Sequence, residues 1–235
     1  MNNKFGIIIY ISTILVLLFY TTNIFSQSNF GIRAGANFAT YSGKNTIDNS
    51  KAKPGIFAGV MFEIPLRYME VLQVGGFLSQ QGTRSEIEKF NYGHKNYYRQ
   101  EIKVNYLVVP LTWKQIWGDV YTKIGPYGAI ATSAEYKWFE RKEYPDSIYE
   151  ASGVQASFVR SLRQYDLGFT LGVGYQTPIS EKVDVFLDFT YSLGLFSIYN
   201  YTDKPNPVMR NQAITITTGM VFTNKQKRYA PKRRR

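Results

Sequence analysis

The sequence predicts an all-β fold, an eight-stranded, antiparallel, up-and-down transmembrane β-barrel. Eight segments alternate apolar and polar residues with a period of two. The connections between them are short and long in turn, and aromatic residues gather at the segment ends. A chain of 235 residues with no cysteine suits one such domain, and it excludes a disulfide scaffold or a zinc–thiolate site.

The amino terminus has the pattern of a targeting segment. Lys4 supplies a positive charge, and residues 5–20 form an apolar run. That run is shorter than the roughly 20 residues that a membrane-spanning helix needs. Ser26 offers a small residue for cleavage. We therefore expect residues 1–26 to be a cleaved signal peptide, with an uncleaved anchor as the alternative, and residues 27–224 to form the barrel.

The first four predicted strands each carry one apolar face. Their apolar positions are Phe30, Ile32, Ala34, Ala36 and Phe38; Ile56, Ala58, Val60, Phe62 and Ile64; Leu72, Val74, Gly76 and Leu78; and Leu107, Val109, Leu111 and Trp113. Upstream in the fourth segment, Val104 and Tyr106 fall on the opposite parity. This predicts either a β-bulge or a shifted register there.

The last four predicted strands alternate more regularly. Their apolar positions are Val120, Thr122, Ile124, Pro126 and Gly128; Leu167, Phe169, Leu171, Val173 and Tyr175; Val183, Val185, Leu187, Phe189 and Tyr191; and Ile214, Ile216, Thr218, Met220 and Phe222. The intervening positions are rich in glycine, hydroxyl and charged residues. A soluble barrel would bury the apolar face, whereas a membrane barrel turns it outward.

Two patterns favour the membrane barrel over a soluble secreted one. The connections at residues 65–70, 115–119 and 177–182 are short, and those at 40–53, 82–100, 133–164 and 194–211 are long. This matches short periplasmic turns and long extracellular loops. Aromatic residues at strand ends predict girdles at the two lipid headgroup levels. The predicted girdle residues are Tyr68, Trp113, Trp117, Tyr175, Tyr191 and Phe222.

Several short motifs, in this order, resemble the small outer-membrane β-barrel family typical of Bacteroidota, described as porin-like or PorT-like. They are FGIRAGANF at 30–38, YLVVPL at 106–111, GPY at 125–127, DLG at 166–168 and YSLGL at 191–195. Val108 stands where the family commonly has an acid, so a polar role is lost there. The terminal aromatic Phe222 matches what barrel-assembly machinery is expected to read in the family. The resemblance implies a fold and a cell-envelope location, and it implies no shared reaction.

Charged residues are expected inside the barrel. On the predicted phasing the lumen holds Arg33, Glu63, Lys123, Asp166, Asp184 and Asp188. Buried charges must pair, and Arg33 and Lys123 are the natural partners of these carboxylates. We expect a structural ion network, with a proton or ion path as the alternative. Large inward side chains at Phe57, Tyr121 and Tyr127 argue against an open pore.

Catalytic residues are not indicated. His94 is the single histidine, and its polar surroundings predict an exposed loop position. Ser79 and Ser85 lie nearby in the sequence without forming a recognisable hydrolase motif. One histidine and no cysteine leave no metal site of ordinary composition. We therefore expect no enzyme activity, metal or cofactor, with a lipid-modifying enzyme as the third functional hypothesis.

The long connection at 133–164 is the predicted contact surface. Its candidate contact residues, for a protein or a glycan, are Tyr136, Trp138, Phe139, Tyr144 and Tyr149. The segment is equally suited to fold over the barrel mouth as a lid. The main hypothesis is a non-enzymatic structural or interaction protein in contact with outer-membrane lipid and an envelope protein. The alternative is a narrow channel for ions or small solutes.

The formal charge of +11 belongs mainly to the carboxyl terminus. Seven basic residues occupy 225–235, and the predicted barrel has only 20 basic against 17 acidic residues. This distribution and the signal segment exclude a nucleic-acid partner. An even strand number places both mature termini in the periplasm, where the tail is either solvated or in contact with anionic headgroups or a partner. The basic tail residues are Lys225, Lys227, Arg228, Lys232, Arg233, Arg234 and Arg235.

Overall fold

The computed structural model describes residues 28–43, 50–67, 69–91, 94–144, 146–155, 163–198 and 209–223. The predicted signal peptide and basic tail lie outside the described residues. The strands are β1 (Asn29–Ser42), β2 (Ser50–Arg67), β3 (Glu70–Asn91), β4 (His94–Trp117), β5 (Val120–Tyr144), β6 (Ser147–Gln155), β7 (Tyr165–Pro178), β8 (Val183–Gly194) and β9 (Arg210–Phe222). None of the residues described here forms a helix with the length and apolar character needed to span a membrane.

Eight of these strands close into a ring. Each pairs antiparallel with its neighbours in the order β1-β2-β3-β4-β5-β7-β8-β9, and β1 pairs with β9 to complete the circuit. The closing pair runs from Phe30 opposite Phe222 to Ser42 opposite Arg210. The predicted eight-stranded antiparallel barrel is confirmed. The ninth strand, β6, lies outside the ring and pairs with β5.

Short turns join the strands at one end of the barrel. Trp117 pairs with Val120 across a two-residue turn, and Gly118 there has a φ of 71°, which glycine adopts without steric cost. Met69, in the turn between β2 and β3, has a φ of 69°. That conformation is strained for a residue with a long side chain. We call this end of the barrel the short-turn end.

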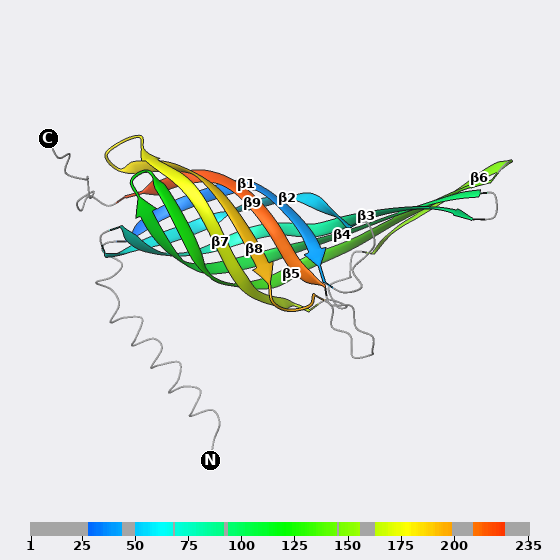
Figure 1. The fold of residues 1–235 in the computed structure, drawn as a ribbon, viewed down its shortest axis with the longest axis horizontal. Helices are drawn as coiled ribbons and strands as arrows, with labels where there is room; N and C mark the ends of the chain where they lie inside the picture. The colour runs from blue at the N-terminus through cyan, green and yellow to red at the C-terminus, as the bar shows by residue number, and fades with distance from the viewer. Residues whose placement is uncertain are drawn as a thin grey trace, which may run out of the picture.

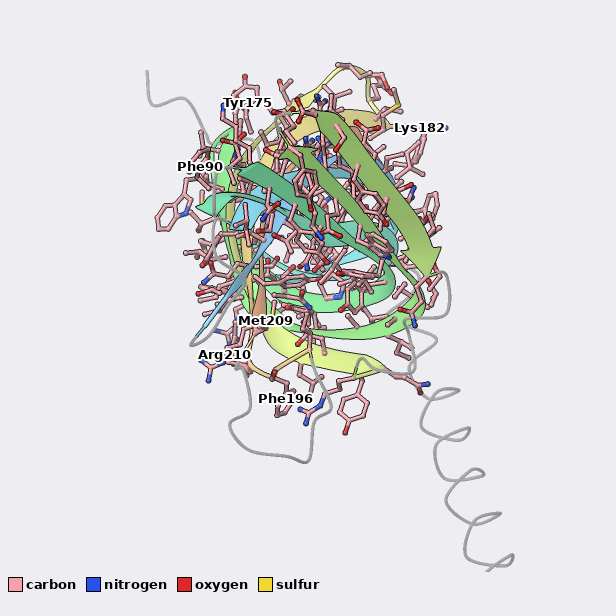
Figure 2. All side chains as sticks on the ribbon, turned by 90° about the vertical axis from the view of Figure 1, so that its right-hand side faces the viewer. Phe90, Tyr175, Lys182, Phe196, Met209 and Arg210 are labelled. Atoms are coloured by element: carbon pink, nitrogen blue, oxygen red, sulfur yellow. The ribbon has the colours of Figure 1, made fainter. Side chains whose placement is uncertain are left out.

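The barrel wall places apolar side chains outside and polar ones inside. Along β7, Leu167, Phe169 and Leu171 are exposed, whereas Asp166 and Thr170 are buried. This is the arrangement predicted for a membrane barrel and the reverse of a soluble one. Figure 2, which looks along the barrel, shows side chains on both sides of the wall.

The bulge or shifted register predicted in the fourth segment near Val104 and Tyr106 is wrong for β4, because these two apolar side chains belong to the interior face; a bulge at this level lies instead in the neighbouring strand β5. Both residues face the interior, in phase with the rest of β4. Asn105 of β4 pairs with Ser133 of β5, and the next residue of β4, Tyr106, pairs with Ala131 of β5. Thr132 of β5 is therefore an extra residue with no partner position on β4. The Thr132 hydroxyl donates to the Asn105 carbonyl at 3.0 Å, so the bulge has its own hydrogen bond.

Two of the predicted loops are wrong, because residues 82–100 and most of 133–164 are β-structure. β3 and β4 pair without interruption to Asn91 opposite His94, and β5 continues to Tyr144 before turning into β6. Figure 1 shows β3, β4, β5 and β6 extending far beyond the barrel. We call this extension the arm; it comprises residues 82–91, 94–105, 133–144 and 147–155. Cross-strand pairing of charged and aromatic side chains stabilises strands that have no apolar face.

Candidate functional site

A charged cluster lies in the barrel interior around Asp188. One carboxylate oxygen, Oδ2, accepts from Lys123 Nζ at 2.7 Å, Arg33 Nη2 at 3.3 Å and the Tyr121 hydroxyl at 2.8 Å. The other oxygen accepts from the Thr190 hydroxyl at 2.5 Å. Asp188 is fully buried and both cations are nearly so. We call Arg33, Lys123 and Asp188 the Asp188 cluster.

Aromatic rings hold the Arg33 guanidinium in place. Its central carbon lies 5.6 Å from the ring centroid of Phe77 and 5.0 Å from that of Phe186. Arg33 Nη2 also donates to Gln73 Oε1 at 3.3 Å. Contact with two aromatic rings restricts the orientation of the guanidinium, so the position of the Arg33 side chain in the interior is fixed.

A second ion pair lies next to the first and involves a residue that the sequence analysis missed. Lys114 Nζ donates to Glu63 Oε1 at 2.7 Å, and Gln73 Nε2 donates to the same oxygen at 3.0 Å. The Lys114 ammonium lies 4.1 Å from the ring centroid of Tyr121, which links the two groups. The alternation of Lys114 with the outward Trp113 was the signal that could have placed it inside.

The remaining predicted lumen carboxylates stand apart from these pairs. Asp166 Oδ2 accepts from the Tyr127 hydroxyl at 3.1 Å and from Asn211 Nδ2 at 2.8 Å. Asp184 is half-buried and accepts from Gln176 Nε2 at 3.0 Å. The predicted residues therefore occupy several places in the interior.

Apolar side chains fill much of the rest of the interior. One buried cluster includes Tyr106, Tyr127 and Met209, and another includes Phe77 and Tyr121. Phe57 packs against the second cluster. A cavity of about 40 Å³ lies in the polar region, with Arg33 and Lys123 in its lining. Tyr121 and Tyr127 occupy the interior as predicted from their size and parity.

Charged pairs organise one face of the arm, which we call the charged face; it carries Arg84, Glu86, Arg99, Glu101, Lys137, Phe139, Arg141 and Glu143. Glu86 Oε1 accepts from Arg84 at 2.5 Å and from the Tyr97 hydroxyl at 3.1 Å, and it pairs with Arg99 at 3.2 Å. Lys51 lies 3.4 Å from the other Glu86 oxygen. Partial desolvation alone would raise the pKa of Glu86, but the Tyr97 and Lys51 hydrogen bonds and the charges of Arg84 and Lys51 lower it.

The predicted contact residues of the 133–164 segment lie on strands and divide between the two faces of the arm. Tyr136, Trp138, Tyr144 and Tyr149 share the face opposite the charged one, and Phe139 lies on the charged face. The Tyr136 hydroxyl is 3.5 Å from that of Tyr98 on β4. Four of the five candidates therefore share one face with the Glu140–Lys142 ion pair, and Tyr136 on this face packs against the apolar cluster of the barrel interior.

His94 begins strand β4, so the expectation of a loop position is wrong for its backbone. The Ser79 hydroxyl is buried in the barrel, where it accepts from Asn37 Nδ2 at 3.1 Å. Among the residues for which placement is described, no three His, Cys, Asp or Glu side chains group together as a metal site would need.

Comparison with known proteins identifies the family. Residues 25–200 match the family described as outer membrane protein beta-barrel domain, which covers most of the chain. The chain belongs to this family. No curated protein matches the sequence. The narrower likeness to porin-like and PorT-like barrels of Bacteroidota stays a prediction.

Several solved outer-membrane proteins are similar in structure at low sequence identity. Ail, the attachment invasion locus protein of Yersinia pestis, is 9% identical with a TM-score of 0.36, covering 83% of this chain and 99% of its own. OprG of Pseudomonas aeruginosa is 11% identical with a TM-score of 0.34, covering 84% and 97%. The outer membrane protease OmpT of Escherichia coli is 9% identical with a TM-score of 0.32, covering 84% and 97%.

Membership in the outer membrane β-barrel family explains the exposed apolar band. The outward side chains of this barrel face lipid, which removes the cost of exposing them to water. Trp113, Trp117, Tyr175 and Phe222 are exposed near the short-turn end, and Tyr191 is exposed toward the opposite end of β8. Tyr68, the remaining predicted girdle residue, lies outside the described residues. An integral outer-membrane location follows from the family.

Proposed function

We propose that this outer-membrane barrel is a non-enzymatic interaction protein that presents its arm to a partner outside the cell. The arm is the observation that carries the proposal. β5 continues for 12 residues beyond the bulge, from Ser133 to Tyr144. At about 3.3 Å per residue this corresponds to roughly 40 Å of strand. A paired, extended sheet of that length places side chains at a distance from the membrane at little entropic cost on binding.

The orientation follows from the strand count and the turns. With eight ring strands, β1 begins and β9 ends at the short-turn end. Short turns face the periplasm in outer-membrane barrels, and longer connections face outward. Both mature termini then lie in the periplasm, and the arm lies outside. The basic tail at 225–235 is available there for anionic headgroups or an envelope protein.

The packed interior supports an interaction role over transport. The Asp188 cluster lies beside side chains such as Phe77 and Tyr121 that occupy the barrel interior. A narrow channel is the second candidate, favoured by the charged side chains of Arg33 and Lys123 in the lining of the 40 Å³ cavity. Recordings in planar bilayers separate the two roles. A large, stable single-channel conductance would require the channel function in place of the proposed one.

The absence of enzyme activity is proposed from the chemistry of the chain, since it has one histidine and no cysteine. A His94→Ala variant is expected to leave the lipid composition of the outer membrane unchanged. A changed lipid profile in that variant would support the lipid-modifying alternative.

Affinity purification from intact outer membranes tests the interaction role. The informative variant lacks the arm: an Asn-Gly turn joins Ser85 to Gln100, and a second joins Tyr136 to Gln155, because each of these pairs faces across the sheet. A variant lacking residues 225–235 is the matched control for the tail. We expect a crosslinked partner with the full chain and the tail deletion and its loss with the arm deletion. Equal recovery with and without the arm would contradict the proposal.

A further inference from the structure

The polar layer of the barrel interior carries one surplus positive charge. In the Asp188 cluster, the two cations Arg33 and Lys123 share a single carboxylate. The neighbouring Lys114 and Glu63 form a one-to-one pair. All five side chains are at most 6% exposed, so water outside the barrel does little to screen them. An uncompensated charge in such a place is costly.

The other interior acids do not cancel this charge locally. Asp166 is hydrogen-bonded to Tyr127 and Asn211, in the part of the interior that holds Tyr106. Asp184 is half-buried near the short-turn end, where water reaches it. The ion pairs of Arg33 and Lys123 both go to Asp188.

A cavity of about 40 Å³ adjoins the surplus charge. Arg33, Lys123, Thr112 and Thr217 all line it. Three polar atoms of these residues are buried and have no hydrogen-bond partner in the structure: Arg33 Nε, Thr112 Oγ1 and Thr217 Oγ1. Arg33 Nε can only donate, and each threonine hydroxyl has a proton to donate. Free donors and a positive charge are therefore carried by side chains that line one space in the interior.

We propose that this cavity binds a small monovalent anion of chloride size. The cavity is larger than the space that one water molecule needs, so it has room for a monatomic anion. One negative charge matches the single surplus positive charge. Water alone satisfies the free donors but leaves the charge uncompensated. Sulfate or phosphate brings more charge and volume than the layer accommodates.

The anion completes the packing of the interior. Arg33 reaches Asp188 through Nη2, so Nε remains available for the anion on a guanidinium already fixed by Phe77 and Phe186. The Lys123 ammonium supplies charge from the opposite wall, on β5. The site is preorganised, and halide binding stabilises the folded barrel by mass action because the unfolded chain has no such site.

Thermal unfolding of the purified full-length mature barrel in detergent micelles tests the site. Sodium chloride replaces sodium gluconate at constant ionic strength, and bromide and sulfate are the comparison anions. We expect the unfolding temperature to rise and saturate with chloride and with bromide but not with sulfate. Broadening of the ³⁵Cl NMR line by the protein, reversed by bromide, reports binding independently of unfolding.

Two variants assign the effect to this cavity. Lys123→Met removes the surplus charge while Asp188 keeps Arg33, Tyr121 and Thr190 as partners, so it is expected to fold and to lose the chloride dependence. Thr217→Val keeps shape and charge and is expected to weaken chloride binding by about tenfold. Lys137→Met, on the exposed arm, removes the same charge elsewhere and is expected to retain wild-type chloride dependence.

The proposal would be overturned by equal unfolding temperatures of the wild-type barrel in chloride and gluconate, together with no ³⁵Cl broadening by the wild-type protein that bromide reverses. That result assigns water alone to the cavity. Because the NMR measurement and Thr217→Val do not depend on Lys123→Met folding, the test stands even if that variant fails to assemble.

Discussion

Replacing Asp188 with asparagine is the most direct test of the interior network. The substitution keeps the size of the side chain but leaves Arg33 and Lys123 as two buried cations with no carboxylate between them. Removing one partner of a buried ion pair costs about 3–5 kcal/mol. Two hydrogen bonds to a charged group at about 1.5–3 kcal/mol each give a similar sum. We expect Asp188→Asn to lower the free energy of unfolding by about 4 kcal/mol.

Urea unfolding in chloride-free buffer measures this loss, with tryptophan fluorescence and the mobility of unheated samples in gels as reporters. Asp184→Asn is the matched control: Asp184 is half-buried, so that variant should stay within about 0.5 kcal/mol of wild type. Asp188→Asn combined with Lys123→Met restores the wild-type surplus of one charge and should be more stable than Asp188→Asn alone. A loss below about 1 kcal/mol for Asp188→Asn would refute the reasoning, since it would mean that water reaches the cations.

Three further predictions address other parts of the structure. Lys114→Met leaves the Glu63 carboxylate buried with no cation, and it should lower the free energy of unfolding by about 3 kcal/mol in urea titrations. Gly35→Ala places a methyl group against the backbone of β9 and should cost about 1–3 kcal/mol by the same assay. The pKa of Glu86 is lowered in the folded arm from its ordinary value of 4.5. The Glu86 carboxylate therefore stabilises the folded arm fully above pH 4.5, and this stabilisation is lost as the pH falls through the folded pKa. The protection of amide hydrogens in β3 and β4 of the arm, measured relative to the intrinsic exchange rate at each pH, should therefore fall in acid.

Each of these predictions has its own control. A methyl group at Gly76 meets no atom within 4 Å, so Gly76→Ala should unfold like wild type, and equal losses at Gly35 and Gly76 would exclude the steric explanation. Glu86→Gln should make the protection of the arm, relative to the intrinsic exchange rate, independent of pH in that range. If its protection still falls in acid, other carboxylates control the arm. An unaltered unfolding curve for Lys114→Met would contradict the stabilising role assigned to the Lys114–Glu63 pair.

The period-two pattern predicted the barrel because lipid demands an apolar face from every strand that crosses it. Leu167, Phe169 and Leu171 are outward for that reason, and the same parity placed Asp166 and Asp188 inside. The arm escaped prediction because it contacts no lipid. Its strands alternate charged with aromatic side chains, such as Arg99 with Tyr98, so neither face is apolar, and the residues resembled a loop.

The individual contacts of the interior depend on how the sheet is wound into a ring. Arg33 and Asp188 are 155 residues apart in the sequence, and their meeting is set by register and by strand tilt around the barrel. Parity identified which charges enter the lumen but not which of them meet. Lys114 was not predicted, although its position next to the outward Trp113 on β4 places it on the interior face.

The extra residue Thr132 reverses which side chains of β5 face inward. Below it, odd-numbered residues of β5 such as Tyr121 and Lys123 face inward, and beyond it even-numbered ones such as Ala134 do so. Beyond the bulge, Tyr136 and Trp138 therefore lie on the inward-facing side of β5, and Lys137 and Arg141 lie on the opposite side. Deleting Thr132 would exchange the inward-facing and outward-facing side chains of β5 beyond the bulge, which no single substitution achieves. Insertion or deletion at the bulge is therefore the shortest evolutionary path to a new outward surface on an unchanged barrel.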